Sequence, residues 1–363
     1  MSHSPYSALD LPRVINASGK MTALGGTAQS AAVAEAQRLA AQHHVDLDAL
    51  RAVAGKQIAG RTGAEAATVT TGAAAGIAIG VAAMITGADR AKVEQLPDTN
   101  GLADEIILQA GHDVSFGARI TQMIRLGGGR PVLVGSRESV TPGDLSRAIS
   151  DRTAGLLFVQ SHHTRQRNGL TLDQLVNVGR DSGLPVLVDA AAEADLTTYI
   201  AQGADLVTYS GGKAIGGPTC GFIAGRTALI EACELQNLGI ARAMKVGKEQ
   251  IIGLLSALDR YPSEPTWPDR VHRLETALQG LPDAVIGRAA DLAGRDIERV
   301  ALRSAPERLR TLAESLRSGD PVIYTRNHQL EEGLMLFDLR EVKDEDVDRL
   351  ADRVRQLWMA EGS

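Results

Sequence analysis

Between residues 64 and 225, short apolar segments alternate with amphipathic ones. Several apolar segments are continuous, as in strands that are covered on both faces of a sheet. The intervening segments fit helices, and one ends in Ser182-Gly-Leu-Pro185, a helix stop followed by a strand start. The expected strands are Ala67–Thr71, Ile106–Leu108, Val132–Val134, Gly155–Val159, Val186–Asp189, Leu206–Tyr209 and Phe222–Ala224, with helices at 143–150 and 172–182 among them. This alternation predicts an α/β fold with a mostly parallel, seven-stranded sheet.

A second, smaller domain is expected after residue 260. The segment Tyr261–Pro268 holds three prolines in eight residues, which is typical of a domain junction. Beyond it, Pro321–Tyr324 and Gly333–Asp338 fit strands, and Asp344–Met359 fits an amphipathic helix. We therefore expect an N-terminal segment (1–60) that wraps the main domain, a large α/β domain (61–260) and a small α+β domain (261–363).

Composition narrows the class of protein. The chain has 363 residues and a net charge of −6, which argues against binding to nucleic acid or to an anionic membrane. Cys220 and Cys233 are too few for a disulfide framework, and no metal-ligand spacing is present. The start of the chain lacks the apolar core of a signal peptide, and the apolar run 73–85 is too short to span a bilayer. A cytoplasmic protein is expected.

Small residues follow the first expected strand and open a helix. The segment is Thr71-Gly-Ala-Ala-Ala-Gly76. A helix N-terminus offers unpaired N–H groups to a phosphate, and small residues let that phosphate approach. The alternative is a plain strand-to-helix turn. The segment lacks the Gly-Lys-Ser/Thr ending of a nucleotide P-loop, so ATP is not expected.

Two further residues stand at the ends of expected strands. Asp189 ends the strand Val186–Asp189, where open α/β sheets bind ligands. Lys213 follows the strand Leu206–Tyr209 in Tyr209-Ser-Gly-Gly-Lys, where glycines would allow a cofactor to approach the amine. Taken alone, Asp189 could cap a helix and Lys213 could be a solvated loop lysine. The combination of phosphate loop, strand-end aspartate and glycine-flanked lysine favours a pyridoxal 5′-phosphate (PLP) site.

The order of these elements resembles the fold-type I PLP enzymes. More narrowly, the chain resembles the selenocysteine-synthase-like group and, within it, the D-glucosaminate-6-phosphate ammonia-lyase branch. The matching segments are VINASGKMT (14–22), GHDV (111–114), MIRLGGG (123–129), GADLVTYSGGKAIGGPT (203–219) and YTRNH (324–328). Gly216 departs from the pattern, since many close relatives in the lyase branch have glutamate there. That difference concerns the substrate more than the cofactor.

The resemblance implies a role for each residue of a PLP site. Thr71, Gly72 and Ala73 would hold the cofactor phosphate, His112 would stack on the pyridine ring, Asp189 would bind the ring nitrogen, Lys213 would carry the cofactor as an imine, and Ser210 would place a hydroxyl near the phosphate or the imine. For His112, a loop histidine that caps a helix is the alternative. At least a homodimer is also implied, because fold-type I sites usually lie at a subunit interface.

Substrate contacts are expected from two other regions. Fold-type I enzymes typically bind the substrate carboxylate with an arginine like Arg326, and the alternative is a surface arginine in a hairpin. Either His162 or His163 could face the same crevice, and His162 is our choice. Cationic contacts for a distant substrate phosphate could come from Arg119, Arg125, Arg165 or Arg167.

The expected activity is α,β-elimination from a small or sugar-derived amino acid. Lys213 would remove the Cα proton, and loss of the β-hydroxyl and of ammonia would give a 2-oxo acid. The resemblance suggests D-glucosaminate 6-phosphate as the substrate. A PLP-dependent racemase, epimerase or aminotransferase shares the first steps and remains an alternative. A PLP-binding protein without turnover is the alternative from outside the enzymes.

Overall fold

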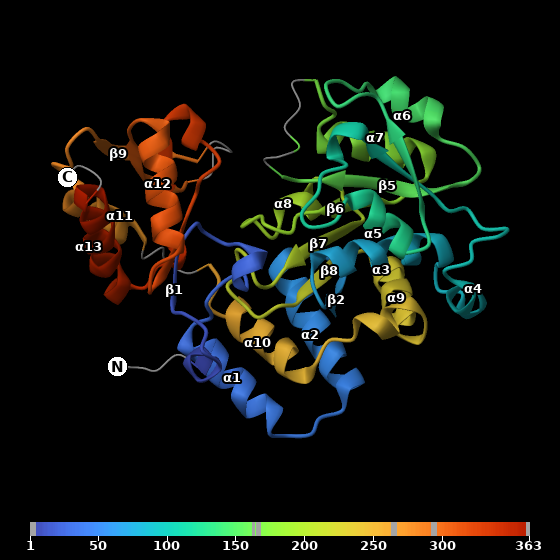
Figure 1. Cartoon of the computed structure of the whole chain (residues 1–363). Helices are drawn as coiled ribbons and strands as arrows, with labels where there is room; N and C mark the ends of the chain where they lie inside the picture. The colour runs from blue at the N-terminus through green and yellow to red at the C-terminus, as the bar shows by residue number, and fades with distance from the viewer. Residues whose placement is uncertain (1–4, 162–163, 165–167, 263–266, 292–295, 361–363) are drawn as a thin grey trace. The chain divides into compact units, whose positions relative to one another are not determined.

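The computed structural model describes residues 5–161, 164, 168–262, 267–291 and 296–360 (Figure 1). The chain forms two compact units, which we call the large unit (Gln29–Pro262) and the small unit (Met1–Ala28 with Ser263–Ser363). The structure thus divides the expected N-terminal segment, because residues up to 28 belong with the C-terminal part of the chain and the following ones with the large unit.

The large unit is built on a seven-stranded sheet with the order β2-β8-β7-β6-β5-β3-β4. Its strands are β2 (Ala66–Thr70), β3 (Glu105–Gln109), β4 (Arg130–Val134), β5 (Thr153–Val159), β6 (Val186–Asp189), β7 (Leu206–Ser210) and β8 (Gly221–Gly225). In the order of the sheet, β4, β3, β5, β6 and β7 are parallel to one another. Strand β8 is antiparallel to both of its neighbours, β7 and β2. All seven expected strands are present, which confirms the predicted mostly parallel α/β sheet.

Helices cover both faces of this sheet, as Figure 1 shows around β5. They are α1 (Ala31–Ala41), α2 (Leu47–Thr62), α3 (Ala73–Thr86), α4 (Arg90–Gln95), α5 (Ile120–Leu126), α6 (Pro142–Ala148), α7 (Leu172–Ser182), α8 (Thr198–Ala201), α9 (Thr227–Leu235) and α10 (Lys248–Leu258). On β6, Val186 and Val188 pack toward the side of α1, α2, α6, α7 and α10, while Leu187 packs toward α3, α5 and α9. Burial on both faces explains why this strand is continuously apolar.

Helix α3 is buried against the sheet and lies between α5 and α9. Gly76 faces β7, where a Cβ atom on this residue would overlap Thr208. The small residues of the segment 71–76 therefore serve close packing of helix on sheet as well as any ligand. Among the described residues, no helix is both long and apolar enough to cross a membrane.

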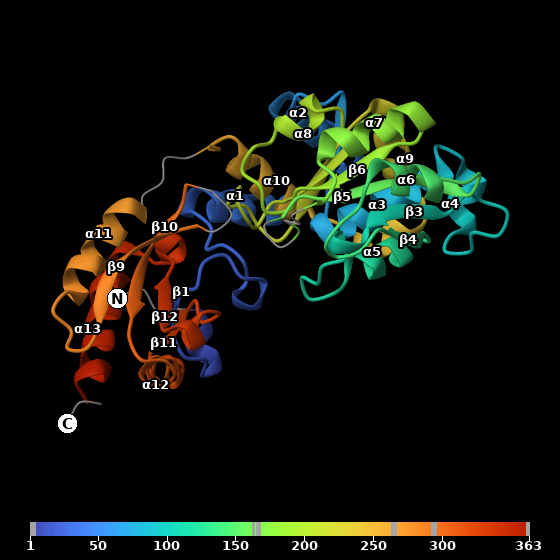
Figure 2. The ribbon, with the colours of Figure 1, turned by 90° about the horizontal axis from the view of Figure 1, so that it is seen from above.

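Segments from near the start of the chain and from its last part pair with each other in the small unit. Strand β1 (Val14–Ala17) pairs in parallel with β11 (Val322–Thr325), and β12 (Leu334–Phe337), β10 (Glu298–Arg303) and β9 (Val285–Ala290) form a separate antiparallel sheet. Helices α11 (Trp267–Leu278), α12 (Pro306–Arg317) and α13 (Asp344–Ala360) pack on these strands around a core that includes Trp358. Figure 2 shows α11 beside β9 and β10.

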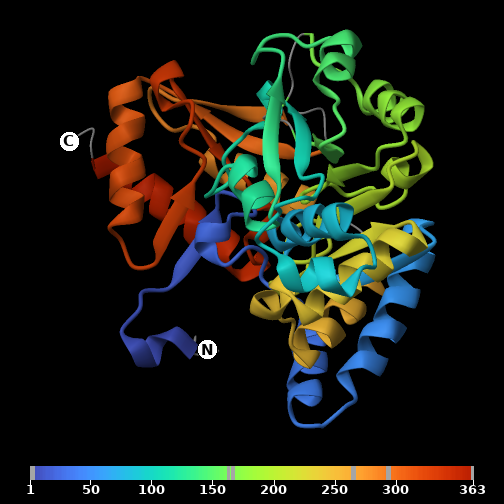
Figure 3. The same cartoon turned by 90° about the vertical axis from the view of Figure 1, so that its right-hand side faces the viewer.

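In the large unit, too, segments far apart in sequence lie together. Figure 3 shows α1 and α2, in blue, beside α10, in orange. Lys248 at the start of α10 donates hydrogen bonds to the carbonyl oxygens of Ala40 and Ala41, each at 2.8 Å. This contact ties α1 to the segment that follows the last strand of the sheet.

Candidate active site

Asp189 is the last residue of β6, in the middle of the sheet. It pairs in register with Val159 of β5 and with Thr208 of β7. Its buried carboxylate accepts one hydrogen bond among the described residues, from the N–H of Ala191 at 3.1 Å. Burial raises the pKa of Asp189 to about 6, although that hydrogen bond and the charge of Lys213 oppose the shift. A buried carboxylate with so little compensation is suited to a cationic N–H partner.

Lys213 lies in the loop between β7 and β8. The loop is closed by backbone hydrogen bonds from Gly211 to Cys220 and from Gly217 to Gly211, both at 2.8 Å. Lys213 is close enough to Asp189 to lower the pKa of that carboxyl. Its Nζ lies 5.8 Å from the centre of the Phe116 ring. We did not foresee Phe116 from the sequence, where its only signal is an aromatic side chain in a glycine- and serine-containing loop.

His112 follows β3 in a short 3-10 turn, and its ring is fixed from two sides. The Nδ1 atom accepts the N–H of Val159 at 3.1 Å, and the ring packs edge-on against Phe158 with 4.6 Å between centres. Burial lowers the pKa of His112 to about 4, so the ring is neutral at pH 7. Because Nδ1 is an acceptor, the proton lies on Nε2. Since Val159 pairs with Asp189, the imidazole stands one strand away from that carboxylate.

The N-terminus of α3 lies near the same edge of the sheet. The helix begins at Ala73, and the hydroxyl of Thr70 donates to the carbonyl of Gly72 at 2.9 Å. A Cβ atom on Gly221 would come within 3.0 Å of the Gly72 carbonyl carbon, so glycine is needed for this approach. The N–H groups of the first turn have no partner within the helix and can bind an anion.

The structure brings most of the predicted cofactor residues to one edge. Because β2, β3, β6 and β7 run in the same direction, their carboxyl ends coincide, and these ends carry Thr71–Ala73, His112, Asp189, Ser210 and Lys213. Thr71 directly follows β2, and Ser210 ends β7 with its N–H donating to Ala191 at 3.2 Å. The roles of these residues stay predictions.

The predicted substrate residues are placed differently. Arg326 belongs to the small unit, where its backbone pairs with Leu336 and its Nη1 donates to the carbonyl of Ser18 at 3.3 Å. His162, with Arg165 and Arg167, lies outside the described residues. Arg119 forms an ion pair with Asp113 at 3.0 Å.

Comparisons with known proteins agree with this geometry. The family model described as SelA, L-seryl-tRNA selenium transferase, matches residues 14–278. D-glucosaminate-6-phosphate ammonia lyase from Salmonella typhimurium is 43% identical over 98% of both chains. 5′-C-glycyluridine monooxygenase-decarboxylase from a Streptomyces species is 42% identical over 98% of this chain and 92% of its own. A solved structure of D-glucosaminate-6-phosphate ammonia-lyase covers both chains fully, with 41% identity and a TM-score of 0.96.

Fold, site and relatives together define a PLP-dependent enzyme of fold-type I, which confirms the fold class and the cofactor expected from the sequence. The chain belongs to the SelA family, described as L-seryl-tRNA selenium transferase. The residues present fit PLP. A buried carboxylate with one hydrogen bond can take a ring N–H, a helix N-terminus can take a phosphate, and Lys213 can take the aldehyde.

Proposed function

We propose that this protein is a PLP-dependent ammonia-lyase that acts on D-glucosaminate 6-phosphate or a similar sugar-derived amino acid. The observation that carries the proposal is the likeness to the lyase along the whole chain, in sequence and in fold. In the reaction, the Cα–H and Cβ–OH bonds break and water leaves. Water then replaces the amino group, so the products are a 2-oxo acid and ammonia.

Cofactor binding is assigned to residues of the large unit. The N–H groups at the start of α3, with Thr71, hold the cofactor phosphate. Asp189 holds the proton on the ring nitrogen, His112 stacks on the ring, and Ser210 offers a hydroxyl. When bound, PLP withdraws electrons from the substrate Cα, which makes its proton removable.

Lys213 is assigned the proton transfer at Cα. Its amine takes the proton, and the resulting ammonium is attracted by the face of the Phe116 ring. We assign the substrate carboxylate to Arg326, since a guanidinium can hold a carboxylate by two parallel hydrogen bonds. His162 remains a predicted substrate contact. We also propose that the enzyme is cytoplasmic and at least a homodimer. Sedimentation of the purified protein would test the oligomeric state, and fractionation of the cells would test the location.

The Streptomyces relative supports a second candidate function. Its identity to this chain is nearly that of the lyase, and its name describes oxidative decarboxylation of a nucleoside amino acid. This chemistry consumes dioxygen and releases carbon dioxide, whereas elimination requires no oxidant. The two reactions are therefore separable by their reactants.

The test combines spectrum and products. The purified protein should show a visible absorbance band of the Lys213-bound cofactor that borohydride bleaches, and the Lys213→Ala variant should lack it. With D-glucosaminate 6-phosphate under nitrogen, the parent should form oxo acid and ammonia in equal amounts. Lys213→Ala should lower the rate about a hundredfold or more.

Other outcomes decide between the candidates. Oxygen uptake with carbon dioxide release would favour the monooxygenase-decarboxylase. An inverted substrate would favour a racemase. A protein that stays colourless with added PLP would contradict the cofactor assignment.

A further inference from the structure

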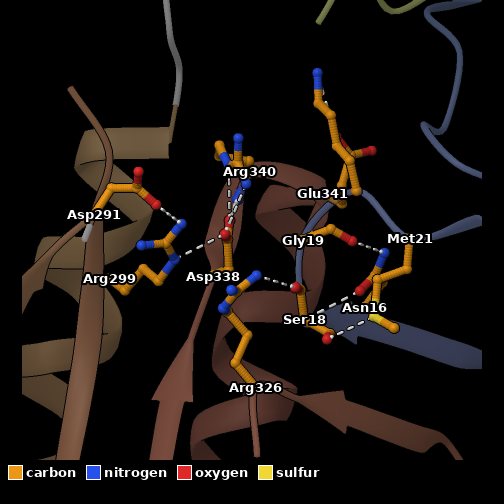
Figure 4. Close-up of polar contacts among 11 residues, drawn as sticks. Asn16, Ser18, Gly19, Met21, Asp291, Arg299, Arg326, Asp338, Arg340 and Glu341 are labelled. Atoms are coloured by element: carbon orange, nitrogen blue, oxygen red, sulfur yellow. Dashed lines mark hydrogen bonds and ion pairs between the residues drawn. The ribbon is translucent and has the colours of Figure 1, made fainter. Parts of the chain in front are cut away.

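A buried carboxylate in the small unit organises a cluster of charged side chains. Asp338 follows β12 and accepts the Nε of Arg299 at 3.0 Å. It also accepts the Nε and Nη2 of Arg340, at 2.9 and 2.8 Å, in a two-bond fork. Figure 4 shows guanidinium groups around this carboxylate. Although burial opposes it, Arg340 and Arg299 hold the pKa of Asp338 below its ordinary value.

Arg326 belongs to this cluster but has no ion-pair partner among the described residues. Its Nε is buried without a hydrogen-bond partner, and no described carboxylate forms an ion pair with it. Burial and repulsion by Arg299 lower the pKa of Arg326. By contrast, Arg299 is paired with both Asp291 and Asp338. A largely buried cation without an ion-pair partner is costly, and an anionic ligand would lower that cost.

A loop at the start of the chain brings Lys20 to the cluster. The side chain of Asn16 closes the loop, because it accepts the N–H of Ser18 at 3.0 Å and donates to the carbonyl of Gly19 at 2.9 Å. Gly19 has φ +86°, and a Cβ atom there would lie 2.8 Å from Asp338 Oδ2. Glycine therefore lets the loop reach Asp338. Lys20 Nζ then lies 3.9 Å from Glu341 Oε1.

Two guanidinium groups of the cluster keep hydrogen-bonding capacity for a ligand. Arg326 Nε has no hydrogen-bond partner among the described residues. The fork to Asp338 uses Nε and Nη2 of Arg340, so Nη1 has no hydrogen-bond partner among the described residues. Its N–H groups, like the Nε–H group of Arg326, can serve an anionic ligand.

We propose that Arg340 and Lys20 bind the substrate carboxylate together with Arg326, and that Asp338 is the positioning residue that holds Arg340 for this task. The proposal rests on the proposed function for the identity of the ligand. It assigns carboxylate recognition to a preformed subsite of the small unit rather than to one arginine. It also explains the loop 16–20, which folds onto Asp338.

The test compares two ligands that differ only in the carboxylate group. D-gluconate 6-phosphate carries a carboxylate and a phosphate but no amine, and D-glucitol 6-phosphate carries the phosphate alone. Calorimetry on the PLP-loaded full chain measures both affinities for the parent, Arg340→Gln, Arg340→Lys, Lys20→Gln and Asp338→Asn. Arg310→Gln, which removes an exposed ion pair with Glu331, is the matched control.

We expect Arg340→Gln and Lys20→Gln to weaken binding of D-gluconate 6-phosphate about tenfold or more, and to leave D-glucitol 6-phosphate unchanged. Arg340→Lys should recover part of the loss. Asp338→Asn should weaken the same ligand and raise KM more than it lowers kcat. Equal losses for both ligands, or none, would overturn the proposal.

Failure of the proposed function gives a different pattern. If the parent binds neither sugar phosphate, the assigned substrate is wrong. The subsite is then tested with glycine and methylamine, which also differ by a carboxylate, through the change each causes in the cofactor spectrum. Weaker binding of glycine alone in the Arg340 and Lys20 variants would support the subsite, and unchanged binding would overturn it.

Discussion

Two buried aspartates, one in each unit, meet opposite environments. Asp189 in the large unit accepts one hydrogen bond from the described residues, and burial raises its pKa to about 6. Asp338 in the small unit accepts three hydrogen bonds shorter than 3.1 Å from two arginines, and its pKa lies below the ordinary value. Among the described residues, no cation forms an ion pair with the first carboxylate, whereas two arginines form ion pairs with the second. The contrast fits the two proposals, in which Asp189 binds the ring N–H of the cofactor and the arginines around Asp338 bind an anion.

The largest effect is expected from Asp338→Asn. The substitution keeps the shape but removes the negative charge that Arg299 and Arg340 share. Breaking a buried ion pair from one side typically costs about 3–5 kcal/mol. Urea unfolding at pH 7 should show a loss of this size. A loss below about 1 kcal/mol would mean that solvent already compensates the arginines.

Asp189→Asn should raise the free energy of unfolding of the cofactor-free protein, whereas Asp338→Asn should lower it. A carboxyl whose folded pKa is about 6, against about 3.9 when unfolded, destabilises the fold by about 3 kcal/mol at pH 7. The parent should therefore lose stability as the pH rises from about 4 to about 6, and the variant should lack that part of the curve. The variant should also lose activity with PLP bound. An unchanged pH curve would contradict the assignment.

The contribution of His112 to the stability of the fold should depend on pH in the reverse direction. Its folded pKa is about 4, against about 6.5 when unfolded, so the unfolded chain binds a proton that the folded chain does not. Stability from this group is present above pH 6.5 and is lost as the pH falls toward 4. His112→Phe should remove this slope in unfolding curves, whereas Asp189→Asn should make it steeper. Similar curves for the two variants would contradict both assignments.

A smaller loss of stability is expected from a substitution of Gly19, the glycine next to Asp338. Gly19 and Gly25 both have φ near +85°, but only at Gly19 would a Cβ atom meet another group. Gly25→Ala should cost about 1 kcal/mol for backbone strain alone. Gly19→Ala should cost about 1–3 kcal/mol more, because it pushes the loop away from Asp338. Equal losses in thermal unfolding would show that the loop yields without disturbing the cluster.

The large sheet could be read from the sequence because its strands are short, continuous apolar runs between helices. Strands β1, β9 and β10 were missed. In β9, Val285 and its neighbours are exposed or half-buried, so that this strand lacks a buried apolar run. Arg326 lies between the successive strands β11 and β12, as expected, and it pairs antiparallel with Leu336 of β12, while β11 itself pairs in parallel with β1.

The candidate site, too, could be predicted only where a local sequence pattern marks its residues. Asp189 and Lys213 could be predicted as site residues because strand ends mark them in sequence, and parallel strands bring such ends together. The contacts of Asp338 come from residues 299 and 340 and from the loop at 19, which no local pattern connects. Phe116 beside Lys213 was missed for the same reason.

The parallel pairing of β1 with β11 has a consequence for the order of folding during synthesis. The large unit is one continuous stretch, so it can fold while the ribosome is still adding the last hundred or so residues. The small unit cannot complete its fold until Val322–Thr325 leaves the ribosome and pairs with strand Val14–Ala17. A nascent chain therefore carries strand β1 unpaired until Val322–Thr325 has been made. Deletion of the first 17 residues should damage the last part of the protein to be made.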